Sequence, residues 1–226
     1  MKIELHIHTC GFSHCGVLST AQAVELYHRA GYDAIVITNH FSTVSRQWFW
    51  EHGGKDYLES HFAAVEEAAE YGRQCGLLVM GGLELRFNES ENDYLVYGMS
   101  KEQCADHEKI FAMTPVEFGE FARRNGILFY QAHPFRNKMK IVPPEALFGI
   151  EVLNTHPRHD SRNEIAAMWA EKYSLHRIPG TDCHLADDVG SSALFTDFPV
   201  KNMDDLIHVL RNDLYTFAAA PAAGEK

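Results

Sequence analysis

Short apolar runs alternate with helix-like segments along the chain, and side chains that can bind metals close almost every run. The run at residues 2–5 ends at His6 and His8, and the run at residues 34–39 ends at His40. Strand–helix alternation predicts a mainly parallel sheet covered by helices. Because nearly every strand has such an end, we expect a closed barrel rather than an open sheet, whose site is fed by few strands.

Later runs end in the same way. They are residues 77–83 before Glu84, residues 127–131 before His133, and residues 178–181 before Asp182 and His184. Imidazole and carboxylate are the groups that hold divalent transition metals. Side chains at the carboxyl ends of barrel strands converge on one face. The sequence therefore predicts a hydrolytic site that holds several metals.

The helical segments carry recognisable ends. Ser19 and Gln22 form a capping-box pattern, and Gly31 ends the helix that follows. A second capping box begins at Thr114, with proline at the first helical position. Another helix is expected at about residues 56–75. The intervening stretch, residues 41–55, is predicted to be irregular, and its aromatic side chains indicate either a loop over the site or a hydrophobic plug.

Length and charge narrow the class of protein. A chain of 226 residues fits one domain, which we place at residues 1–218 with a loose tail at 219–226. The net charge of −11 disfavours long nucleic acid as a partner. No apolar run is long enough to span a membrane, and a strand begins at once without a signal peptide. Five cysteines without a CxxC pair argue against disulfides, so a cytoplasmic location is expected. The sequence leaves the oligomeric state open.

A set of motifs carries a resemblance to a known family. The set comprises His6-Ile7-His8, His14, Ile37-Thr38-Asn39-His40, Gly82-Leu83-Glu84, Ala132-His133-Pro134 and Gly180-Thr181-Asp182-Cys183-His184. In this order the motifs resemble the PHP (polymerase and histidinol phosphatase) family of metal-dependent phosphoesterases. The resemblance covers residues 3 to about 190. It implies an α/β fold, a single-domain distorted seven-stranded (β/α)7 TIM-like barrel, with two or three divalent ions of zinc, manganese or iron.

The resemblance also implies which residues bind each metal. The first metal is assigned to His6, His8, Glu84 and Asp182, the second to Glu84 and His133, and the third to His14, His40 and His184. The family commonly has a further histidine ligand, and Asp93 stands at that position here. A carboxylate there favours a harder ion such as manganese. Asn39 replaces the more usual aspartate and is expected to orient a ligand.

The implied chemistry is hydrolysis of a small phosphate ester, a phosphomonoester or a nucleotide, by a metal-bound hydroxide. Catalytic roles are expected for Glu84, Asp182 and His184, and phosphate contacts for Arg136 and Arg158. Weaker candidates for substrate contact are Arg86, His156 and His159. Cys15 and Cys183 are interpreted as bystanders, and Asp187 with Asp188 as a solvated loop.

Three alternatives remain. An exonuclease or oligonucleotide phosphodiesterase would need a basic approach to the pocket. A non-catalytic PHP accessory module would keep the fold and lose the activity. The metal-dependent amidohydrolases also begin with HxH, but they usually need a larger barrel and a bridging lysine, and no lysine stands at a suitable strand end.

Overall fold

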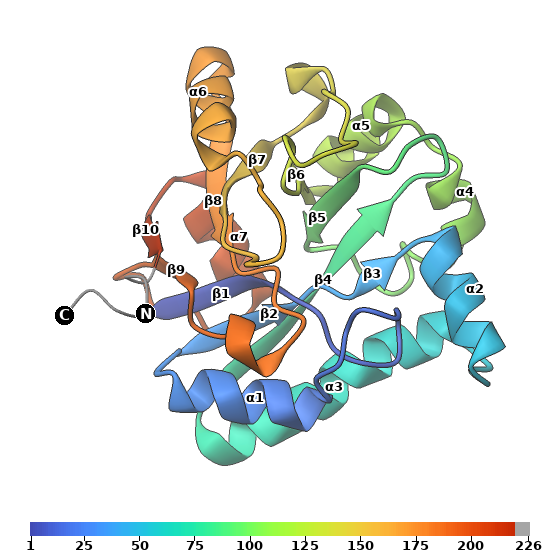
Figure 1. Ribbon diagram of the computed structural model, residues 1–226, viewed down its shortest axis with the longest axis vertical. Coiled ribbons are helices and arrows are strands. Elements are labelled where there is room, and N and C mark those ends of the chain that lie inside the picture. The colour runs from blue at the N-terminus through green and yellow to red at the C-terminus, as the bar shows by residue number, and fades with distance from the viewer. Residues whose placement is uncertain (220–226) are drawn as a thin grey trace.

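Seven strands form the barrel wall in the computed structural model, which describes residues 1–219 (Figure 1). In spatial order they are β1 (Lys2–Ile7), β2 (Ala34–Ile37), β4 (Leu78–Arg86), β5 (Asp93–Tyr97), β6 (Leu128–Gln131), β7 (Gly149–Asn154) and β8 (His176–Gly180). The expected α/β barrel is thus confirmed. Of the expected tail, Ala219 ends the last strand, and residues 220–226 lie outside the described part of the chain.

Three further strands bring the sheet to ten. β9 (Ser192–Phe195) pairs antiparallel with β1, and β10 (Thr216–Ala219) pairs antiparallel with β9. The short β3 (His40–Phe41) pairs with β4. β5 runs antiparallel to both of its neighbours. The sheet is therefore more mixed than the mainly parallel one expected.

The barrel closes between β1 and the segment that follows β8. The backbone N–H of His8 donates to the carbonyl of Cys183 over 2.9 Å, and the N–H of Cys183 donates to the carbonyl of His6 over 3.2 Å. A parallel bridge joins Ile7 to Cys183 at the same place. Closure therefore occurs beside the polar ends of β1 and β8, and it fixes their side chains relative to one another.

Helices cover the outside of the barrel (Figure 1). They are α1 (Thr20–Arg29), α2 (Thr43–Glu51), α3 (Tyr57–Cys75), α4 (His107–Phe111), α5 (Pro115–Asn125), α6 (Asn163–Tyr173) and α7 (Met203–Arg211), with 3-10 turns at Pro144–Ala146 and Ala186–Asp188. Both predicted capping boxes are present, at Ser19 and Thr114. No helix within residues 1–219 combines the length and apolar character that crossing a membrane requires.

The stretch at residues 41–55, expected to be irregular, is largely the helix α2. Ser42 caps it by accepting from the backbone N–H of Ser45, whose hydroxyl in turn accepts from the N–H of Ser42. This serine pair replaces the usual acidic partner, which explains why the sequence pattern concealed the helix. Phe49 packs against the core, while Trp48 reaches the pocket described below. The segment therefore serves both as a plug and as part of the site wall.

Candidate metal centre

Four side chains place their ligand atoms around one point at the carboxyl ends of β1, β4 and β8. The Nε2 atoms of His6 and His8 lie 3.1 Å apart. Nε2 of His6 is 3.2 Å from Oε1 of Glu84 and 3.6 Å from Oδ1 of Asp182. Nε2 of His8 is 3.4 Å from the same Oδ1 and 3.5 Å from Oε2 of Glu84. All four side chains are buried.

These separations are those of a coordination shell. Ligand atoms about 2.05 Å from one tetrahedral metal stand roughly 3.3 Å from each other. The five distances range from 3.1 to 3.6 Å. Two imidazole nitrogens and two carboxylates so close together are a ligand set that fits a divalent ion. The structure therefore brings together the four residues expected at the first metal.

Glu151 orients His6 and was missed by the sequence reasoning. Its Oε1 lies 2.9 Å from Nδ1 of His6, which leaves Nε2 free to face the metal position. Its other oxygen accepts from the backbone N–H of His133 and from the amide of Asn154. The buried carboxylate of Glu151 thus positions both the ring of His6 and the backbone of His133. The available signal was a charged residue inside an otherwise apolar strand.

Asn39 occupies the supporting position expected of it. Its Oδ1 accepts from the backbone N–H of Thr9 over 2.7 Å, and its amide donates to the hydroxyl of Thr9. Asn39 thereby holds the chain directly after His8. It contributes to the placement of that imidazole rather than supplying a ligand itself.

A second group of ligands shares Glu84 with the first. Nε2 of His133 is 3.2 Å from Oε1 of Glu84, and it is 4.0 Å from Oδ2 of Asp93. Both oxygens of Asp93 are already bound by Arg86, through Nε and Nη2 at 2.7 Å each. Arg86 and Asp93 stand directly opposite each other in the β4–β5 pair. A metal at this position therefore competes with a guanidinium for Asp93.

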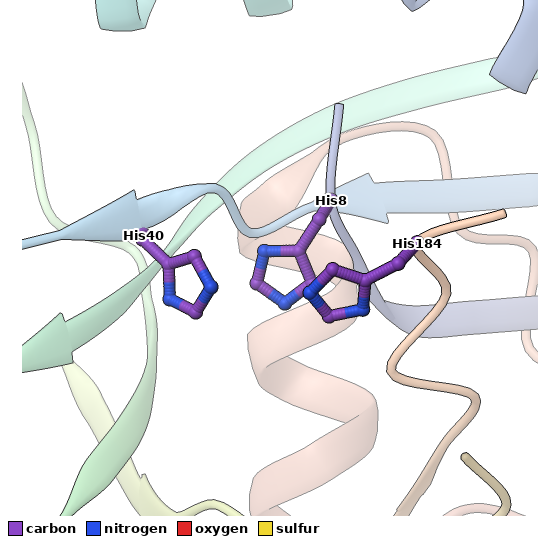
Figure 2. A group of neighbouring side chains, drawn as sticks. All are labelled: His8, His40 and His184. Carbon is purple, nitrogen blue, oxygen red and sulfur yellow. The ribbon is translucent and has the colours of Figure 1, made fainter. Parts of the chain in front are cut away.

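A third group consists of His8, His40 and His184, whose rings converge from three separate segments (Figure 2). The ring of His8 stacks on those of His40 and His184 at 4.3 and 4.2 Å between centroids. His14, also expected as a ligand here, is exposed, and neither it nor Cys15 belongs to a ligand group formed by residues 1–219. Cys15 lies beside His40, with its Sγ 3.4 Å from Nε2 of that imidazole.

Two of the candidate ligands have a strained backbone conformation that surrounding contacts must hold in place. His133 has φ of 29° and Asp182 has φ of 51°, both in the left-handed region that side chains with Cβ disfavour. The His133 N–H is held by Glu151, and the carbonyl of Asp182 accepts from Nδ1 of His184 over 2.8 Å. Backbone strain of this kind concentrates at functional sites.

The buried carboxylates and imidazoles change each other's pKa. Burial disfavours the charged form of His6, but the carboxylates of Glu151 and Asp182 outweigh it and raise the pKa of His6 well above its usual value. Burial raises the pKa of Glu84, yet the neighbouring His40 and His6 outweigh burial and lower this pKa well below the usual range. The shifts favour a proton on His6, whereas burial and the neighbouring His184 and His40 lower the pKa of His8 well below its usual value. A divalent cation would balance the carboxylate charge and displace such a proton.

A pocket of about 560 Å³ is lined by several of the candidate ligands and by Arg86, Arg136 and Arg158; these ligands are His40, Glu84, Asp93, His133, Asp182 and His184. Nη2 of Arg136 donates to Oδ2 of Asp182 over 2.8 Å, whereas its Nε is buried without a partner among the described residues. Arg158 forms a two-pronged pair with Asp188, at 2.8 and 2.6 Å.

Asp188 was expected in a solvated loop, but it is buried. It accepts from the backbone N–H groups of His184 and Leu185, over 2.9 Å each. The carboxylate therefore holds the segment that carries His184 and links it to Arg158. His156 and His159 also line the pocket, and burial lowers the pKa of His156 to about 4.

Comparison with known proteins agrees with this fold. The family model described as PHP-associated matches residues 160–213. A two-domain protein from Bacteroides vulgatus, containing a predicted PHP-like metal-dependent phosphoesterase, has a TM-score of 0.72 at 18% identity, covering 96% of this chain and 64% of that one. PsfC from Pseudomonas syringae has a TM-score of 0.68 at 15% identity, covering 97% and 91%.

Endonuclease Q, in complex with a 27-mer duplex with an abasic lesion at the active site, has a TM-score of 0.61 at 11% identity, covering 93% of this chain and 56% of that one. No curated protein matches the sequence. This chain spans only about two-thirds of the Bacteroides protein, and at these identities the solved structures speak for the fold alone. With the PHP-associated segment, they confirm the PHP resemblance drawn from the motifs.

Proposed function

We propose that this chain, which has a PHP-like fold and carries a PHP-associated segment, hydrolyses a small phosphate ester with two or three bound divalent metals. The observation that carries the proposal is that Nε2 of His6 and Nε2 of His8 lie 3.1 Å apart and that each is 3.2–3.6 Å from carboxylate oxygens of Glu84 and Asp182. Glu84 connects this set to His133 and His40, so neighbouring ions would share one carboxylate.

Zinc, manganese or iron bound here would supply an activated water and would neutralise charge on the phosphate. The chain's own contribution is to hold the ligands rigidly and to keep their acceptor atoms directed inward. Glu151 does so for His6, and the carbonyl of Asp182 does so for His184. No nucleophilic side chain is needed. We assign Glu84, Asp182 and His184 to the reacting centre on this basis.

Arg136 is the best placed residue to bind the phosphate. Its Nε is a buried donor without a partner within residues 1–219, and an unmade hydrogen bond of this kind costs about 1–3 kcal/mol. An anionic oxygen in the pocket would relieve that cost. Arg158 is more exposed and already held by Asp188, so we assign it to the outer part of a substrate.

The test combines metal analysis with an assay of phosphate esters. The full chain is reconstituted with zinc, manganese or iron, its metal content is measured, and hydrolysis of a chromogenic monoester is compared with that of the matching diester. Less than one equivalent of metal together with no turnover would contradict the proposal. Turnover that persists in a His6→Ala/His8→Ala variant would contradict the site, and His28→Ala/His52→Ala, on exposed positions, is the matched control.

A phosphodiesterase acting on oligonucleotides is the second candidate. Three arginines in the pocket and the fold shared with Endonuclease Q favour it, whereas the net charge of −11 opposes long nucleic acid. Preference for the diester, with activity on short single strands that declines steeply with salt, would support this candidate. Metal binding without turnover of either ester would instead indicate an accessory module.

A further inference from the structure

Cys15 lies beside two imidazoles of the candidate centre. Its Sγ is 3.4 Å from Nε2 of His40 and 3.1 Å from the hydroxyl oxygen of Ser13, and Cys15 and His184 line the same pocket. Both Cys15 and its neighbour His14 line this pocket, but Cys15 is partly buried whereas His14 is exposed. The residue that the loop after β1 presents to these histidines is therefore the thiol.

The path of the loop explains this placement. The N–H of Cys10 donates to the carbonyl of Leu18 over 2.7 Å, which closes the loop at its base. At Gly16 a Cβ would meet the carbonyl oxygen of Thr9 at 2.5 Å, so only glycine allows the chain to pass so close. The next N–H, from Val17, donates to the carbonyl of His184 over 3.2 Å. These contacts hold Cys15 against the two histidines.

Both histidines keep a nitrogen for a metal. Nδ1 of His184 is occupied by the carbonyl of Asp182, so its Nε2 remains available. Nδ1 of His40 is 2.6 Å from Oε2 of Glu84, and Nε2 is the atom that faces the sulfur. A sulfur about 2.3 Å and a nitrogen about 2.05 Å from one tetrahedral zinc stand roughly 3.6 Å apart. The observed 3.4 Å is close to that edge.

We propose that Cys15, together with His40 and His184, binds the third metal of the centre as a thiolate ligand in the position expected of His14. Sulfur with two imidazoles makes a softer ligand set than histidine alone, and it selects zinc over manganese at this position. The inference rests on the metal centre of the proposed function, but it does not depend on which ester is hydrolysed.

Cobalt(II) reports the sulfur ligand directly. A thiolate bound to cobalt gives an intense charge-transfer absorption in the near ultraviolet, which nitrogen and oxygen ligands do not give. The full chain loaded with cobalt is expected to show this band, and Cys15→Ser is expected to lose it together with about one equivalent of metal. Cys10→Ser, in the same loop but exposed, is the matched control and retains both.

The outcomes separate this inference from the proposed function. Loss of one metal equivalent in His14→Ala, with the absorption band absent from the unmodified chain, would overturn the sulfur ligand and restore His14. Turnover in that case would leave the phosphoesterase proposal intact. Conversely, a cobalt–sulfur band without turnover of any ester would support Cys15 and contradict the activity. A circular dichroism spectrum confirms that each variant is folded.

Protection of the thiol provides a second measurement. Alkylation by iodoacetamide, located by mass spectrometry, is expected to modify Cys10 at the same rate with and without zinc. Cys15 is expected to react at least tenfold more slowly when zinc is bound. Equal rates for Cys15 in the two states would contradict coordination.

Discussion

The carboxylate of Glu151 lies 2.9 Å from Nδ1 of His6, and both side chains are fully buried. This contact fixes the ring so that the opposite nitrogen faces Glu84 and Asp182. Hydrogen bonds behind a ligand set both its orientation and its basicity. Glu151 is thus as much a part of the candidate centre as the residues that contact the metal.

Replacing Glu151 by glutamine is expected to weaken metal binding by about 10–100-fold while the fold is retained. The amide keeps the shape but loses the charge that favours a strongly donating imidazole. Competition with a chelator measures the change. Glu145→Gln, at an exposed position, is the control and should bind metal like the unmodified protein. An unchanged affinity in Glu151→Gln would show that the contact is merely structural.

Arg136→Lys is expected to lower kcat/KM for a phosphate ester by roughly 10²–10³, the usual cost of losing one donor to developing charge. Lysine keeps the positive charge but cannot contact Asp182 and a phosphate oxygen at the same time. Steady-state kinetics test this, with metal content measured in parallel. Arg73→Lys, on the exposed face of α3, should leave kcat/KM unchanged. A full loss of metal in Arg136→Lys would assign the arginine to the support of Asp182 instead.

Local sequence pattern was sufficient for much of the centre. His6 and His8 follow from the alternation of side chains along a strand, and the candidate ligands near the ends of β4, β6 and β8 follow from the positions of the apolar runs. Contacts between residues far apart in the chain were not predictable from this local pattern. Spacing did not reveal that Cys15 approaches His40, because that approach depends on the close packing of Gly16 on Thr9.

The contacts of buried charged residues were also not predictable from the local sequence pattern. Glu151 contacts His6 and Asp188 accepts from Arg158, and both partners are far away in the chain, so local context alone does not reveal them. The pairing of Arg86 with Asp93 depends on the register of the β4–β5 pair, which places the two residues opposite each other. Predicting that register would have shown that Asp93 is not a free ligand.

The stability of the metal-free protein is expected to fall as pH rises above about 6.5, the ordinary pKa of histidine. The pKa values of His6, His40 and His184 are raised, so these imidazoles gain protons on folding, and that contribution is lost as pH rises toward their folded values. Burial raises the pKa of Cys15, but contacts with His184 and His40 lower it overall to about 5. The contribution of Cys15 to the pH dependence of stability therefore opposes that of these three imidazoles.

Bound metal is expected to reverse this dependence. Metal replaces protons on the imidazoles, so its affinity, and with it the melting temperature, rises with pH. Thermal unfolding between pH 6 and 8, with chelator and with zinc, measures both slopes. Each net proton changes the free energy of unfolding by about 1.4 kcal/mol per pH unit at most. Slopes of the same sign in both conditions would contradict proton–metal exchange at these histidines.

Arg86→Met is expected to strengthen binding of the second metal. The guanidinium holds both oxygens of Asp93, and removing it frees a carboxylate 4.0 Å from Nε2 of His133. An ion pair worth about 1.4 kcal/mol would change the affinity roughly tenfold. Metal titration with manganese measures the change, and adding Asp93→Asn should abolish the gain. Arg158→Met removes a similar two-pronged pair elsewhere in the pocket and should not affect this metal. If Arg86→Met leaves the titration unchanged, Asp93 serves the arginine and is not a ligand.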